Sequence, residues 1–179
     1  MTNRSKFSAS LCVVATILLV LGFTSGLRAD ESLYNPAEAE KVAPGSGVDF
    51  GPRASEFRYD KRMIHAAEIA MRRAKVSSTE RCWRYVKDAL VDAQLVDSRP
   101  TTAYAKEAAQ ELTTKYGFTK LEGLISPLEA PIGSVIVYGG KGAGHVEFRT
   151  AFGFVSDFWS LIPSRRPLLG VYVKEPSQS

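Results

Sequence analysis

The sequence contains little cysteine and little histidine, with two residues of each type among 179. So few cysteines exclude the disulfide framework of small secreted domains. The histidines, His65 and His145, are far apart, and no pair of His and Cys residues has the close spacing of zinc ligands. We therefore expect neither a bound metal nor a cofactor. His65 lies among charged residues at helical spacing, which predicts a solvated position on a helix surface.

A strong excess of positive charge is also missing once the amino-terminal residues are set apart. The chain carries 23 Lys and Arg against 19 Asp and Glu, a formal net charge of +4. Residues 1–29 contain Arg4, Lys6 and Arg28 and no acidic residue, so the remainder has 20 cations against 19 anions, or +1. That balance gives no support to a nucleic-acid-binding protein.

No apolar run reaches the roughly 20 residues that span a bilayer. The run at 11–23, LCVVATILLVLGF, follows a positively charged start and precedes small residues, an arrangement typical of a secretory signal peptide. We predict cleavage after Ala29, which gives an exported protein in the periplasm or the extracellular space, without membrane attachment. Cleavage removes Cys12 and leaves Cys82 as a lone thiol, which in an oxidising compartment must be buried or used.

The rest of the chain divides by composition. Residues 30–56 are rich in Pro, Gly and Ala and poor in large apolar side chains, so we expect a flexible leader. A single domain is expected over 57–175, long enough for one core, followed by a short tail at 176–179. Nothing in the sequence suggests self-association, and we expect a monomer.

Within that domain, hydrophobic periodicity predicts helices first and strands afterwards. The expected helices span 57–75, 79–95 and 102–116, and the expected strands span 133–138, 145–150, 154–159 and 170–174. The second helix is expected to start at a capping box of Ser77 and Glu80, with Thr79 as a competing N-cap. The third is expected to end at Gly117. Helices followed by strands indicate an α+β domain with an antiparallel sheet.

Cys82 lies in the first turns of the second expected helix. A thiolate at this position is stabilised by the unpaired N–H groups and the positive end of the helix dipole, and Arg81 and Arg84 add positive charge nearby. The alternative is a buried structural cysteine, since Cys82 shares an apolar helix face with Val86 and Leu90.

His145 opens a predicted strand directly after the glycine-rich turn at 139–144. The turn does not match a phosphate-binding loop, because no Lys-Ser or Lys-Thr follows a glycine and a strand takes the place of the required helix. The glycines instead allow a tight turn and leave space beside the imidazole.

The hairpin that follows His145 supplies a candidate partner for the imidazole. A three-residue loop at 151–153 pairs Thr150 with Phe154 and Glu147 with Asp157. This register places four polar residues on one face: His145, Glu147, Arg149 and Asp157. Asp157 is then diagonal to His145 and within reach of it. The alternative for the three charged residues is a surface ladder of salt bridges.

A nucleophilic thiol needs a base, and the base needs an acceptor that orients it. Cys82, His145 and a carboxylate supply these three parts. We predict Asp157 as the third residue, because Arg149 can neutralise the competing Glu147 on the same strand. Glu147 remains the alternative.

Three stretches of the sequence resemble the papain-fold cell-wall hydrolases, namely the CHAP amidases and the NlpC-type peptidases. These stretches are TERCWRYVKDAL (79–90), GSVIVY (133–138) and GHVEF (144–148). The resemblance covers about residues 78–175 and implies a papain-like α+β fold without a cofactor. It also implies Cys82 as nucleophile, His145 as base and a third residue on the following strand, which Asp157 matches best.

Such enzymes cut amide bonds in peptidoglycan, so the resemblance implies peptidoglycan or its stem peptides as the substrate. Two alternatives stay open. One is a non-catalytic module of the same fold that binds the cell wall or a protein. The other is a secreted toxin or effector that applies the same Cys–His chemistry to a protein.

Overall fold

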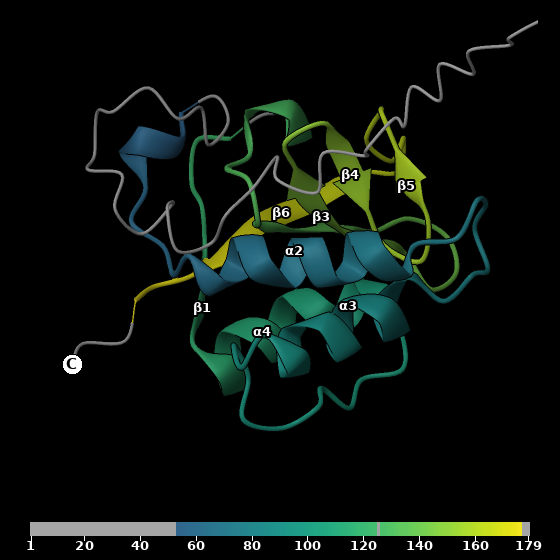
Figure 1. Cartoon of the computed structure of the whole chain (residues 1–179), viewed down its shortest axis with the longest axis horizontal. Coiled ribbons are helices and arrows are strands. Elements are labelled where there is room, and N and C mark those ends of the chain that lie inside the picture. Colours follow the sequence, from purple (N-terminus) through teal and green to yellow (C-terminus); the bar gives the residue numbers. More distant parts are fainter. Residues whose placement is uncertain (1–52, 125, 177–179) are drawn as a thin grey trace, which may run out of the picture. The chain divides into compact units, whose positions relative to one another are not determined.

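The computed structural model of the protein describes residues 53–124 and 126–176 (Figure 1). The predicted signal peptide, most of the predicted leader and residues 177–179 of the tail lie outside these ranges. The helical elements, with η for 3-10 helices, are η1 (Ala54–Glu56), α2 (Arg62–Arg73), α3 (Cys82–Asp92), η2 (Ala105–Glu107), α4 (Ala108–Tyr116) and η3 (Pro127–Glu129). None of the described helices is long and apolar enough to span a bilayer.

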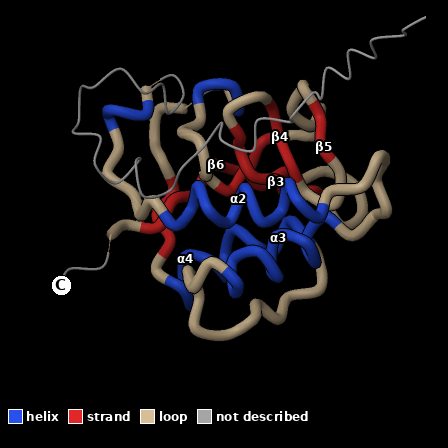
Figure 2. The backbone as a smooth tube through the Cα atoms, in the orientation of Figure 1, coloured by secondary structure: helices blue, strands red, loops and turns tan. Residues whose placement is uncertain are grey.

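Six strands form one sheet. They are β1 (Phe118–Lys120), β2 (Val135–Tyr138), β3 (His145–Thr150), β4 (Gly153–Val155), β5 (Trp159–Ser160) and β6 (Leu168–Lys174). Their order is β1-β6-β2-β3-β4-β5, and every neighbouring pair is antiparallel. Helices α2, α3 and α4 gather on one side of the strands (Figures 1 and 2). The predicted α+β class is confirmed, although β1 was not predicted.

The core lies between these helices and the sheet. Alanines at the contact of α2 and α3, such as Ala66, Ala70 and Ala89, are fully buried, and their small side chains let the two helices approach closely. On the sheet, the buried residues of β2 and β3 include Val137 and Phe148, both without exposed surface. This packing fixes the start of α3, which carries Cys82, against β3, which carries His145.

The start of α3 differs from the prediction. The helix begins at Cys82, and its N-cap Arg81 makes no side-chain capping bond, so the predicted capping box is wrong. Glu80 has a φ of 61°, a left-handed conformation that a helix cannot continue through. The helix end predicted at Gly117 is confirmed for α4, since Gly117 has the left-handed φ of 68°.

The predicted hairpin register is also wrong. The turn between β3 and β4 has two residues, Ala151 and Phe152, and Thr150 pairs with Gly153 in place of Phe154. A shift of one residue exchanges the two faces of β4 relative to β3, so Asp157 no longer joins the face of β3 that carries His145, Glu147 and Arg149. Moreover, β4 ends at Val155, and Asp157 lies beyond the paired residues.

Candidate active site

Cys82 is the first residue of α3, and its thiol is free and half-buried. The first N–H groups of a helix have no carbonyl partner within the helix, and the dipole is positive at that end. The backbone around Cys82 therefore favours a negative charge on sulfur or on a bound oxygen.

Asp157 fixes the turn that leads into Cys82. Its Oδ2 accepts hydrogen bonds from the N–H of Thr79 at 2.5 Å, from the Thr79 hydroxyl at 2.9 Å and from the N–H of Arg81 at 3.2 Å. Burial alone raises the pKa of this carboxyl, but the bonds from Thr79, Arg81 and Ser156 outweigh it and lower the pKa. These donors precede the first residue of α3, so Asp157 holds the turn that leads into the helix.

His145 bridges the thiol and a carboxylate. Its Nε2 lies 3.1 Å from Oε2 of Glu147, and the Cys82 side chain is near enough to raise the pKa of the imidazole. Burial lowers the pKa of His145, but the bonds and charges of Cys82 and Glu147 outweigh burial and raise the pKa to about 9. The imidazole therefore holds its proton at neutral pH.

Glu147 is the carboxylate that contacts His145, two residues along β3 and on the same side of the strand. Only 3% of its surface is exposed. Its Oε1 accepts the Tyr138 hydroxyl at 2.6 Å and the N–H of Ser164 at 3.2 Å. The predicted contact between Asp157 and His145 is not formed, since it depended on the wrong hairpin register.

Arg149 was expected to neutralise Glu147. Its guanidinium donates to the carbonyls of Thr150 and Gly153, at 2.6 and 2.9 Å, and lies over the Phe154 ring at 5.0 Å. Tyr138 and Ser164 were not singled out in the sequence. Pairing the strand at 133–138 with the strand after the glycine turn would have placed Tyr138 opposite His145, as it is in the sheet.

The glycine-rich turn sets the position of His145. Gly144 has a φ of 76°, and a Cβ built there would lie 2.5 Å from the Tyr138 carbonyl oxygen and 2.7 Å from Lys106 Cβ. The N–H of Lys106 also donates to the carbonyl of Ala143 at 3.0 Å, which ties the turn to η2. The turn is followed by strand β3, as predicted.

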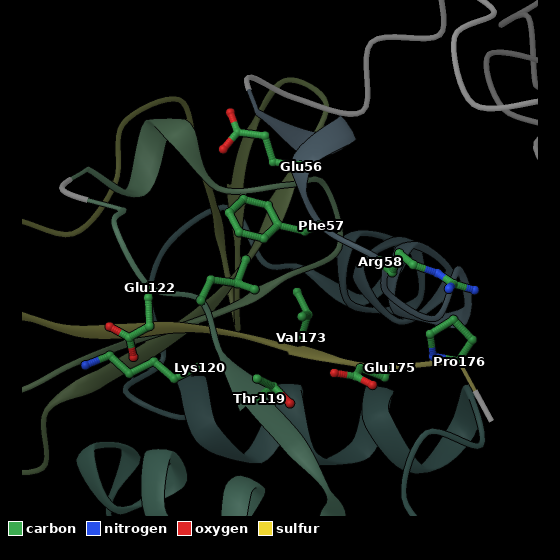
Figure 3. Close-up of a pocket in the computed structure, with 10 residues that line it drawn as sticks. Glu56, Phe57, Arg58, Thr119, Lys120, Glu122, Val173, Glu175 and Pro176 are labelled. Carbon is green, nitrogen blue, oxygen red and sulfur yellow. The ribbon is translucent and has the colours of Figure 1, made fainter. Parts of the chain in front are cut away.

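The described residues contain no group of three or more His, Cys, Asp and Glu side chains able to hold a metal ion. A pocket of about 780 Å³ lies where β1 and β6 meet the segment before α2 (Figure 3). Its lining mixes both signs of charge, with Arg58 and Lys120 against Glu122 and Glu175, and includes neither Cys82 nor His145. It is therefore separate from the Cys82–His145 pair.

Comparison with known proteins identifies the fold. A chain of the native type VI effector–immunity complex Tae3–Tai3 from Ralstonia pickettii is 23% identical and has a TM-score of 0.50. The match covers 63% of this chain and 98% of that one. This protein has the papain-like fold. A chain of the selenomethionine form of that complex is 27% identical, with a TM-score of 0.45 and coverage of 55% and 82%.

No protein-family model matches the sequence, and no curated protein matches it either. The specific resemblance to CHAP amidases and NlpC-type peptidases therefore remains a prediction. In this papain-like domain, α3 supplies a thiol at its first residue, and β3 supplies the imidazole and the carboxylate. Such an arrangement can carry out nucleophilic acyl transfer.

Proposed function

We propose that the protein is an exported cysteine hydrolase that cleaves an amide bond in peptidoglycan. Cys82 is the nucleophile, His145 carries the proton and Glu147 orients His145. The observation that supports this proposal is the position of His145, whose Nε2 lies 3.1 Å from buried Glu147 and whose pKa is raised by the neighbouring Cys82 side chain. Glu147 takes the role first predicted for Asp157.

The reaction follows from the protonation state of the pair. With the proton on His145, the Cys82 thiolate attacks the amide carbon, and N–H groups at the start of α3 stabilise the resulting oxyanion. The imidazolium gives its proton to the departing amine, and the C–N bond breaks to leave a thioester. Neutral His145 then takes a proton from water, whose hydroxide attacks the thioester carbon. The tetrahedral intermediate expels the Cys82 thiolate, and the product leaves as a carboxylic acid that gives its proton to solvent, so the thiolate–imidazolium pair is restored.

Peptidoglycan is supported as the substrate by two independent features. The stretches around Cys82 and His145 resemble cell-wall hydrolases, and the predicted signal peptide at 1–29 delivers the protein to the compartment that holds this polymer. The experiment is incubation of the purified protein with purified peptidoglycan, followed by mass spectrometry of the released fragments. We expect new amine and carboxylate ends with wild type and none with Cys82→Ala. Intact peptidoglycan after wild-type treatment contradicts the proposal.

The second candidate is an effector that acts on a protein. The similarity to a chain of an effector–immunity complex supports an effector role with an immunity partner, and this role fits a protein target and a peptidoglycan target equally well. Cleavage of a target protein with intact peptidoglycan selects this candidate. A non-catalytic binding module is distinguished by thiol reactivity, since fast alkylation of Cys82 by iodoacetamide at pH 6, slowed by His145→Ala, requires an activated thiol.

A further inference from the structure

We propose that Tyr138 is a positioning residue of this site, whose buried hydroxyl holds Glu147 in the orientation that Glu147 needs to act on His145. The inference rests on the proposed function, which assigns Glu147 to the orientation of His145. It adds a residue of β2 to a site otherwise formed by α3 and β3.

Tyr138 is placed for this role by the sheet. It is the last residue of β2 and pairs with His145, the first residue of β3. Its side chain has no exposed surface, and its ring centroid is 5.9 Å from that of His145. The hydroxyl donates to Oε1 of Glu147 at 2.6 Å. A buried, short and charge-assisted hydrogen bond of this kind strongly constrains both side chains.

The two oxygens of Glu147 have different partners. Oε1 accepts the Tyr138 hydroxyl and the N–H of Ser164, whereas Oε2 lies against Nε2 of His145. Rotation of the carboxylate would break the bonds on both oxygens together. The two donors on Oε1 therefore fix the direction in which Oε2 points.

The hydroxyl of Tyr138 acts as the donor in its bond to Glu147. Burial raises the pKa of Tyr138, and the charge of Glu147 and the bond to it raise the pKa further. The titratable groups around Glu147 are then His145 on its own strand, Tyr138 on β2 and, through His145, Cys82 on α3. Ser164, in the segment before β6, contributes its backbone N–H.

Loss of the Tyr138 hydroxyl leaves Oε1 with one donor and lets the carboxylate move away from His145. The pKa of His145 then falls from about 9, because the contribution of Glu147 to that value weakens. The reactive form needs a protonated His145. The variant without the hydroxyl should therefore lose activity at a lower alkaline pH than wild type does.

The test compares Tyr138→Phe with Tyr172→Phe. Tyr172 is a buried tyrosine of the neighbouring strand β6, opposite Val135 of β2, and serves as the matched control. For Tyr138→Phe we expect kcat to fall about tenfold and KM to stay within about threefold of wild type. The alkaline limb of the pH–rate profile should move down by about half a pH unit. Tyr172→Phe keeps the wild-type kcat and pH profile. A Tyr138→Phe enzyme with reduced Tm but unchanged kcat and alkaline limb overturns the inference.

A double-mutant cycle shows whether Tyr138 acts through Glu147. In a Glu147→Gln background, Tyr138→Phe should cause no further shift of the alkaline limb, and fully additive shifts overturn the inference. The titration of His145 by NMR gives a readout that needs no substrate. Wild type that cleaves no peptidoglycan contradicts the proposed function alone. The inference is tested separately, because an unchanged His145 titration in Tyr138→Phe overturns it whether or not peptidoglycan is cleaved.

Discussion

Glu147 and Asp157 are both buried carboxylates close to Cys82 in the fold, yet their partners give them different roles. Asp157 accepts bonds from the backbone and hydroxyl groups of the turn before α3. Glu147 contacts the imidazole of His145. At the scale of single residues, the proposed mechanism therefore needs the charge of Glu147, while Asp157 acts through the backbone that it holds.

Glu147→Gln tests this division. Gln keeps the size of the side chain and an acceptor for Tyr138, but it removes the charge that raises the pKa of His145. We expect kcat to fall about 100-fold, equivalent to about 2.7 kcal/mol of barrier. The alkaline limb of the pH–rate profile should move down from about 9, and Tm should change by only a few degrees. Steady-state kinetics across pH and thermal denaturation measure both effects. A kcat within threefold of wild type contradicts the assignment of Glu147.

At the level of elements, the start of α3 is held by Asp157, a residue of the turn between β4 and β5. Removing the Asp157 carboxylate by Asp157→Ala leaves the N–H groups of Thr79 and Arg81 without their acceptor. We expect a loss of about 3 kcal/mol in the free energy of unfolding, seen as a Tm lower by about 10 °C. Activity should fall as well, because Cys82 is no longer fixed.

Asp157→Asn is the matched control for this prediction. Asn retains one oxygen acceptor and the same shape, so most of the stability and the activity should return. An Asp157→Ala protein with wild-type Tm contradicts the structural role. Low activity in Asp157→Asn despite wild-type Tm points instead to a direct role of the charge in the reaction.

The glycine turn before β3 allows a second comparison of elements. Gly142 and Gly144 both have positive φ values, of 74° and 76°, but no atom lies within 4 Å of a Cβ at Gly142. Gly142→Ala should cost about 1 kcal/mol from backbone strain alone. Gly144→Ala adds contact with Tyr138 and Lys106 and should cost about 3 kcal/mol or more.

Gly144→Ala should also displace His145 and reduce kcat, whereas Gly142→Ala should leave kcat within about twofold of wild type. Chemical denaturation and steady-state kinetics of the two purified variants provide the comparison. Equal effects of the two substitutions would show that the close approach of Gly144 to β2 and η2 does not matter for the site.

At the scale of the whole molecule, buried ionised groups predict how stability depends on pH. Hydrogen bonds and neighbouring charges outweigh burial and lower the pKa values of Asp60, Glu111 and Asp157 below their ordinary values of 3.8 to 4.5. Their stabilisation is present above those ordinary values and is lost as pH falls through the folded-state pKa values. For His145, the folded-state pKa of about 9 exceeds the ordinary 6.5, so its stabilisation is full below 6.5 and is lost as pH rises towards 9.

The free energy of unfolding should therefore be highest between about pH 4.5 and pH 6.5 and should decline on both sides. Urea denaturation from about pH 3 to pH 9 measures the profile. His145→Ala should flatten the alkaline decline and leave the acidic one in place. An alkaline decline of the same size in His145→Ala would mean that His145 does not cause it.

Local sequence patterns were sufficient to predict the α+β class, the bounds of β3, the end of α4 at Gly117 and the position of Cys82 at the start of a helix. These features depend on alternation, helical spacing and single glycines, all of which act over a few residues. Strand β1, with three residues, is too short for such a pattern to identify.

The choice of the carboxylate that contacts His145 depends on how the whole domain folds. A difference of one residue in the length of the β3–β4 turn changes the register, and the local sequence does not fix that length. The contacts of Glu147 with Tyr138 and Ser164 join segments 9 and 17 residues apart, and those of Asp157 with Thr79 join segments 78 residues apart. Such contacts form because the helices and the sheet share one core, which brings together buried polar groups that must find partners.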